Sequence, residues 1–257
     1  MARVAVYDNV QLSLPVNDWN YKLNKTNNNK NMALIEQREK KNYISILGSD
    51  ATLRKVVPEG TLGAVSRTYK DKDEVEHTKI EKAYESVSGK ITNISFVDTD
   101  YGTLLQVELT DPDGFLTGEG CEPEVLSMST SQPFAVDFMK KLPNIDLSKE
   151  VVLKPFAFTP EGGKRELKGL TVTQEGNKIE KSFYDAEAKT NTMGFPNPDE
   201  KLATEKNEMK RKEGWKRYFK DVEIFLVDYT TENFVSKFDK AMVAEAVDDE
   251  MPMPEDY

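Results

Sequence analysis

The stretch SQPFAVDFMKKL at residues 131–142 determines how the sequence on both sides of it is interpreted. Ser131 is a suitable N-cap, and Pro133 fits the first turn of a helix, where its missing N–H group leaves no hydrogen bond unmade. The large apolar residues recur every four positions and therefore share one face: Phe134, Phe138 and Leu142. Pro143 follows directly and stops a helix. The pattern predicts a short amphipathic helix over 131–142.

Three β-prone runs precede this helix and two follow it. In chain order the runs are 83–97, 103–110, 123–130, 150–159 and 166–173. The run 103–110 alternates between two sets of residues with the period of a half-buried strand. Gly89 lies inside the first run, where a glycine often marks a bulge or a sharp bend. Turns rich in Asp and Gly follow the first two runs, at 98–102 and 111–114.

Strand, strand, strand, helix, strand, strand is the order of a five-stranded oligonucleotide/oligosaccharide-binding (OB) barrel. We therefore expect a mainly β protein with helical additions, whose barrel core covers residues 84–184. A five-stranded meander would explain the strands equally simply, but the helix between the third and fourth runs favours the OB barrel.

Extensions flank this core on both sides. Residues 1–41 are polar and rich in asparagine, so we expect an N-terminal arm that buries little. Residues 42–238 then form the OB-fold domain with its extensions, and 239–257 form an acidic tail that we expect to be disordered. Within the extensions we expect a strand at 42–48, a strand or loop at 60–69, a solvated connection at 70–79, an outer helix at 199–220, a strand at 222–229 and a short helix at 234–246.

The net charge of −10 does not exclude a nucleic-acid partner, because the acidic residues are unevenly distributed. Residues 241–257 contain six acids and no lysine or arginine. Subtracting these six from the 45 acids of the chain leaves 39 acids against 35 bases, a net charge near −4. Binding responds to the local field, so a basic face on the body is compatible with this composition. An ordinary soluble protein is the alternative that charge alone would suggest.

The sequence offers little for catalysis. Cys121 and His77 are the only residues of their types, so neither an internal disulfide nor a Cys/His zinc site can form. His77 lies in a charged segment without a nucleophile motif, and no phosphate-binding loop of the P-loop type occurs. The acids around 98–100 and 111–113 suit turns better than a metal site. We expect no enzyme, no metal and no cofactor.

The expected setting is the reducing cytoplasm. The first ten residues lack a basic region followed by a long apolar run, which a signal peptide would need. No apolar stretch approaches the ~20 residues that cross a bilayer. We expect no membrane partner.

The fourth run carries the clearest binding pattern. One set of alternating side chains is Val151, Leu153 and Ala157, and the other is Lys154, Phe156 and Phe158. If the first set faces the core, the second presents two flat rings beside a cation, as binding of single strands requires. A slip by one residue at Pro155 would reverse the faces, and Phe156 and Phe158 would then belong to the core.

Further candidates lie in connections that OB proteins use to clamp a strand. The loop between the fourth and fifth runs contains Lys164, Arg165 and Lys168, and the first connection contains Tyr101. Arg67 and Tyr69 are upstream candidates. Trp215, with the bases Lys212, Lys216 and Arg217 around it, is another potential stacking site. Plain solvation of the loop tip, and packing of the helix that carries Trp215, are the alternatives.

The C-terminal tail combines an acidic run with two prolines and a terminal aromatic residue. Its candidate partner-binding residues are Asp248, Asp249, Glu250, Glu255, Asp256 and Tyr257. Barrel order and tail together resemble the single-stranded DNA-binding replication proteins, particularly those of bacteriophages. Bacterial members usually end in a Pro-Phe pair, whereas this chain ends in Asp-Tyr.

The resemblance implies a sequence-independent binder of single-stranded DNA that acts in replication, recombination or repair inside a bacterial host cell. It also implies that the tail recruits replication proteins, such as a polymerase, helicase or primase, and competes with DNA for a basic groove. Two alternatives stay open: an OB-like protein-interaction module that binds no nucleic acid, and an RNA-binding OB protein.

Overall fold

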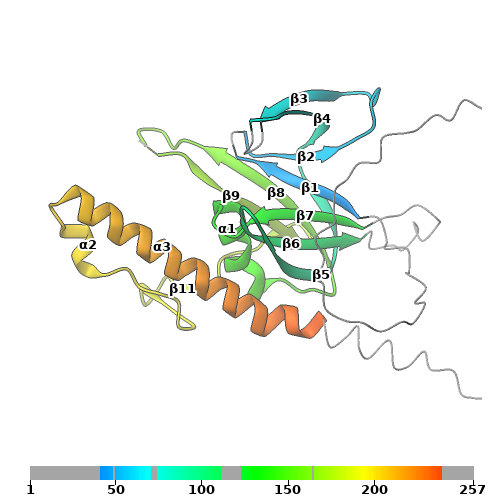
Figure 1. Ribbon diagram of the computed structural model, residues 1–257. Coiled ribbons are helices and arrows are strands. Elements are labelled where there is room, and N and C mark those ends of the chain that lie inside the picture. Colours follow the sequence, from blue (N-terminus) through cyan, green and yellow to red (C-terminus); the bar gives the residue numbers. More distant parts are fainter. Residues whose placement is uncertain (1–40, 49, 71–73, 111–122, 164, 239–257) are drawn as a thin grey trace, which may run out of the picture. The chain divides into compact units, whose positions relative to one another are not determined.

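The computed structural model describes residues 41–48, 50–70, 74–110, 123–163 and 165–238 (Figure 1). The chain divides into two compact units, residues 1–38 and 39–257, and all described residues belong to the second. The predictions for the N-terminal arm, apart from Lys41, and for the acidic tail 239–257 lie outside the described residues.

Ten strands form one sheet. They are β1 (Asn42–Leu47), β2 (Thr52–Val56), β3 (Ala64–Lys70), β4 (Glu76–Tyr84), β5 (Val87–Thr99), β6 (Gly102–Thr110), β7 (Glu124–Ser129), β8 (Glu150–Phe158), β9 (Leu167–Gln174) and β10 (Asn177–Lys178). The strand order is β10-β9-β8-β5-β6-β7-β1-β2-β4-β3, and all neighbours are antiparallel except β1 and β7. A separate two-stranded sheet pairs β11 (Tyr184–Asp185) with β12 (Thr190–Asn191).

Helices lie between and after the strands. They are α1 (Pro133–Lys141) with a 3₁₀ turn η1 (Leu142–Asn144), α2 (Glu200–Thr204), and α3 (Glu208–Thr230) continued by a π-helical turn η2 (Thr231–Val235). The predicted helix between the third and fourth runs is confirmed as α1, between β7 and β8. Its predicted apolar face is buried: Phe134, Phe138 and Leu142.

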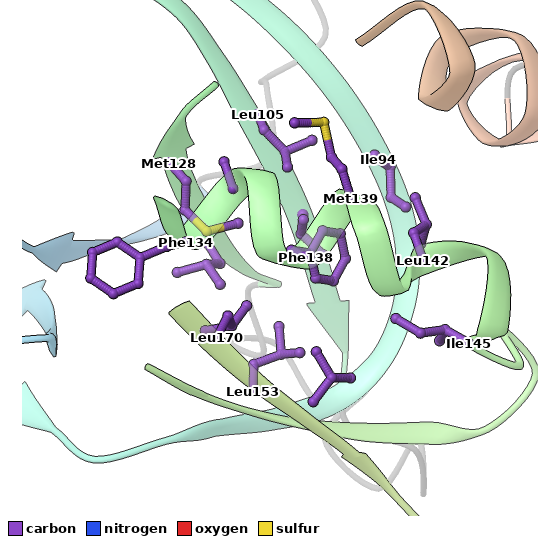
Figure 2. Close-up of a cluster of buried hydrophobic side chains, with 14 of the residues drawn as sticks. Ile94, Leu105, Met128, Phe134, Phe138, Met139, Leu142, Ile145, Leu153 and Leu170 are labelled. Atoms are coloured by element: carbon purple, nitrogen blue, oxygen red, sulfur yellow. The ribbon is translucent and has the colours of Figure 1, made fainter. Parts of the chain in front are cut away.

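The core joins α1 to the five strands that the sequence predicted. Its members include Ile94 from β5, Leu105 from β6, Met128 from β7, Leu153 from β8 and Leu170 from β9. Figure 2 shows these side chains gathered around the helix. The five strands lie in the order β9-β8-β5-β6-β7.

The prediction of a closed barrel requires correction. In the described part of the chain, hydrogen bonding between strands leaves the sheet open. The edge of β7 that faces away from β6, which would close a barrel, pairs in parallel with the upstream strand β1. Asn42 to Ser45 lie opposite Glu124 to Ser127 in this pairing. The result is an open ten-stranded sheet with a long C-terminal helix, and no strand pairing joins β7 to β9 within the described residues.

Side chains of α1 instead cover the part of the β9 edge that β10 leaves unpaired. Asp137 Oδ2 accepts the backbone N–H of Leu170 at 2.9 Å, and Lys141 Nζ donates to the Leu170 carbonyl. Lys141 also lies 2.9 Å from Asp137 Oδ2, and Lys181 lies 2.8 Å from Oδ1. Burial would raise the pKa of Asp137, but hydrogen bonds from Lys181, Lys141 and Leu170 outweigh it and hold the pKa below the usual range.

The predicted strand at 222–229 is wrong, since these residues form the C-terminal half of α3. The run is rich in β-branched and aromatic residues, which suggested a strand. Its inward residues nevertheless follow helical spacing: Val222, Phe225, Leu226 and Tyr229. Val222 and Leu226 join the core, while Phe225 and Tyr229 pack with Phe183 in an aromatic cluster.

The predicted connection at 70–79 is also wrong from Glu76 onward, where β4 begins and pairs with β3. The predicted first run divides, because β4 ends at Tyr84 and β5 begins at Val87. Gly89 lies so close to the C-terminal end of β6 that a Cβ atom there would be 2.7 Å from the Thr110 carbonyl oxygen. Charged residues dominate 70–79, and a solvent-facing pair of strands can carry them as well as a loop can.

Candidate nucleic-acid interface

The faces of β8 follow the predicted alternation. Val151 and Leu153 are buried, whereas Lys154 is exposed and Phe158 has 53% of its surface exposed. Phe156 is half-buried, and its ring centroid lies 5.9 Å from that of Phe158 at an interplanar angle of 40°. The slip that Pro155 could have allowed does not occur.

A glycine on the neighbouring strand makes room for the Phe156 ring. Phe156 lies opposite Gly169 in the β8–β9 pair, and a Cβ atom at Gly169 would be 2.7 Å from Phe156 Cζ. The same atom would also lie 2.7 Å from Asp137 Oδ2. Phe158 lies opposite Leu167, which is 49% exposed. We call Phe156, Phe158 and Leu167 the hairpin patch.

The cations near the hairpin patch differ in their partners. Lys154 forms an exposed ion pair with Glu85, and the hydrogen bond from Lys154 lowers the pKa of Glu85. Lys168 lies 2.8 Å from Glu166 and also donates to the Gly48 carbonyl. Arg165 is exposed and has no ion pair within the described residues. Lys164 lies outside them.

Such exposed ion pairs are weak, because solvent screens both charges. A phosphate could therefore replace Glu85 beside Lys154 with little penalty. Lys168 is held more firmly, since its ammonium group bridges a carboxylate and the turn between β1 and β2.

Arg67 and Tyr69 lie on the β3–β4 hairpin, and the structure gives Arg67 a different role from the predicted one. Its guanidinium group donates to both carboxylate oxygens of Glu81, at 2.9 and 3.0 Å. Glu81 is almost fully buried, and its hydrogen bond raises the pKa of Arg67. Arg67 therefore neutralises a buried carboxylate and is not a free phosphate ligand in this structure.

Tyr69 is framed by groups that the sequence interpretation missed. Its ring stacks on His77 with 5.5 Å between centroids, and Lys79 Nζ lies 4.9 Å from the ring centroid. Both residues belong to β4, which the sequence interpretation treated as a connection. The alternation of His77, Lys79 and Glu81 was the signal that could have identified them.

Strand register places Tyr69 and the hairpin patch on the same surface of the sheet. Residues directly opposite each other in paired strands share a face. The core-facing side of the sheet runs from Leu153 to Val87 opposite it on β5. It continues through Ile94, Val107, Leu126 and Ile44, and Ile46 of the same strand lies opposite Leu53. Arg67 and Tyr69 alternate away from that face, as Phe156 and Phe158 do.

Tyr101 stands at the turn between β5 and β6 and is 78% exposed. Thr99 holds this turn, because its Oγ1 donates to the Gly102 carbonyl at 2.7 Å and accepts the Tyr101 N–H at 3.3 Å. Tyr101, Phe158 and Tyr69 therefore lie on three separate hairpins. No ring contact joins them in the part of the chain that the structure describes.

The described residues were also compared with what a metal site and a membrane-spanning helix require. Among the described residues, no three His, Cys, Asp or Glu side chains lie together where they could hold a metal ion. No described helix is long and apolar enough to span a membrane.

Comparison with protein families, curated proteins and solved structures found no match to this chain.

Proposed function

We propose that this protein binds single-stranded DNA without sequence preference, through the outer surface of its sheet around the β8–β9 hairpin. The observation that carries the proposal is the pair of neighbouring rings, Phe156 and Phe158, on the outer face of β8. The strand order β9-β8-β5-β6-β7, with α1 between the third and fourth of these strands in sequence, supports an OB-type arrangement opened at one edge by β1.

In the proposed complex, bases stack on Phe158 and on the exposed part of Phe156. Phosphates replace Glu85 beside Lys154 and approach Arg165 at the hairpin tip. Tyr101 and Tyr69 offer further rings on two other hairpins. When a lysine or arginine neutralises a phosphate, condensed counterions leave the DNA strand. The logarithm of the binding constant should therefore fall with the logarithm of the salt concentration, with a slope of about −0.7 per phosphate contacted on a single strand.

The acidic tail enters the proposal through its composition. Residues 241–257 would compete with DNA for the cationic surface and, when released, would bind replication proteins such as a polymerase, helicase or primase in a phage-infected bacterial cell. Deleting 241–257 should therefore tighten DNA binding at low salt. An unchanged or weaker affinity would rule out the competition.

Replacing one ring tests the proposed surface. Phe158→Ala should weaken binding of a fluorescent oligo-dT about tenfold, because one stacked base contributes about 1–3 kcal/mol. Tyr184→Ala is the matched control, since Tyr184 is 55% exposed but lies in the separate β11–β12 sheet. Equal affinities of the two variants would remove the hairpin patch from the interface. Comparing poly-dT with poly-U would separate DNA binding from RNA binding.

One observation favours a different function, a protein-interaction module without nucleic-acid binding. Three of the predicted cations already have carboxylate partners: Lys154, Lys168 and Arg67. The exposed Phe158 and Leu167 would then bind an apolar protein surface. Such a module would show no salt-dependent binding of oligonucleotides, so the same titration distinguishes the two functions.

A further inference from the structure

The N-terminal half of α3 has no fully buried residue, although Tyr218 near its end packs against the core. Every residue of α3 that is buried lies in its C-terminal half: Val222, Leu226 and Thr230. Asn207 caps the start of the helix by accepting the N–H of Lys210 at 3.2 Å. In Figure 1 this half extends away from the large sheet with α2 beside it. Leu202 of α2 contacts Gly214, so α2 covers one side of the helix and leaves the others open.

This part of the chain is strongly basic although the whole protein is acidic. Residues 206–220 contain seven bases and two acids, against a net charge of −10 for the chain. Lys212 pairs with Glu208 and Lys220 pairs with Glu223. The remaining cations of the helix have no ion pair within the described residues: Lys210, Arg211, Lys216 and Arg217.

Two aromatic rings stack in the middle of these cations. Trp215 and Phe219 lie with their ring centroids 5.9 Å apart and an interplanar angle of 29°. Phe219 is 61% exposed, an unusual position for a large ring on a helix that could have buried it. Lys212, Lys216 and Phe219 are spaced at i, i+4 and i+7, so they share one side of the helix. We call Lys212, Trp215, Lys216 and Phe219 the α3 ridge.

We propose that the α3 ridge is a second contact for the same single strand, which extends the bound length beyond the hairpin patch. The inference rests on the proposed function. The exposed ring of Phe219, stacked on the half-buried Trp215 and flanked by cations, fits a chain that carries both unpaired bases and phosphates. A duplex keeps its bases stacked inside, so the rings would have nothing to bind there. A purely apolar partner would leave the cations without counter-charges.

The test compares short and long oligo-dT. An oligonucleotide of about 8 nucleotides fits within the ~4–16 that one OB fold covers, whereas one of about 30 can also reach a second contact. The triple variant Lys212→Ala/Lys216→Ala/Phe219→Ala should leave the affinity for the short strand unchanged. Its affinity for the long strand should fall about tenfold or more, as expected for the loss of one stacked base and two phosphate contacts.

A second variant separates the ridge from general charge. Lys210→Ala/Arg217→Ala also removes two cations, but from the opposite side of the same helix. It should weaken long-strand binding much less than the triple variant does. In the wild-type protein, Phe219→Trp should retain most of the long-strand affinity and Phe219→Leu should lose much of it, since only tryptophan keeps a flat ring at this position.

The outcomes distinguish the two proposals. If wild-type protein binds neither strand, the proposed function fails, and the ridge inference fails with it. If wild-type protein binds both strands and the triple variant matches it at both lengths, only the ridge inference is overturned. It is also overturned if that variant instead loses binding of a labelled 241–257 peptide or of phosphatidylglycerol vesicles while oligonucleotide binding stays intact.

Discussion

Replacing Asp137 by alanine tests how α1 is fixed to the edge of β9. The carboxylate is nearly buried and contacts three groups: the Leu170 N–H, the Lys141 ammonium and the Lys181 ammonium. Lys141 is itself almost fully buried. Asp137→Ala therefore leaves an uncompensated buried charge and an unpaired backbone donor at the same time. Breaking a buried ion pair from one side costs about 3–5 kcal/mol.

This loss is large relative to the total free energy of unfolding of a domain, about 5–15 kcal/mol. Urea unfolding followed by circular dichroism should show a clearly lower midpoint for Asp137→Ala. Lys181→Ala should change the midpoint only slightly, because Lys181 is about half exposed. Asp228→Ala is the matched control, since Asp228 is an exposed carboxylate without a hydrogen bond or ion pair within the described residues.

A double variant separates the effect of the unpaired buried charge from the effect of the lost side-chain volume. Asp137→Leu/Lys141→Met removes both buried charges and should recover part of the stability that Asp137→Ala loses. The reasoning would be refuted if Asp137→Ala unfolded at the same urea concentration as Asp228→Ala. The contact between α1 and β9 would then be incidental to the fold.

Three further predictions concern pH and the hairpins. The pKa of Asp137 is lower in the folded state than in the unfolded state. Its contribution to the free energy of unfolding is therefore full above the unfolded pKa of about 3.9 and is lost as pH falls through the folded pKa. In urea titrations, the difference in stability between wild type and Asp137→Ala should narrow below about pH 4. Gly169→Ala should displace the Phe156 ring, cost about 1–3 kcal/mol and weaken oligo-dT binding, and an unchanged melting temperature would contradict this. Arg67→Ala should destabilise the fold by about 1–3 kcal/mol by leaving Glu81 unpaired, whereas Arg67→Lys should recover only part of that loss by thermal melting.

Local sequence signals predicted the central elements of the fold. Turn residues divided the strands, and four-residue spacing identified α1, because these features depend only on neighbours in the chain. Partner choice between distant strands has no such signal. The parallel pairing of β1 with β7, which leaves the sheet open, joins segments about eighty residues apart in sequence.

In the candidate site, too, local sequence predicted some features, and others depend on residues far apart in the chain. Alternation along β8 predicted that Lys154 and Phe158 face away from the core. The ion pair of Lys154 with Glu85 spans 69 positions, and the space for Phe156 depends on Gly169 on another strand, so neither could be predicted from local pattern. The role of Arg67 could not be predicted either, because its partner Glu81 lies fourteen positions away on another strand and nothing in the local pattern shows that this carboxylate is buried.

The most direct test of the central claim is an anisotropy titration of the wild-type protein with labelled single-stranded and duplex DNA of the same length at two salt concentrations. We predict that the single strand binds more tightly than the duplex and that its affinity drops steeply as salt rises. No detectable binding of the single strand at low salt, or equal affinity for both DNAs, would contradict the account.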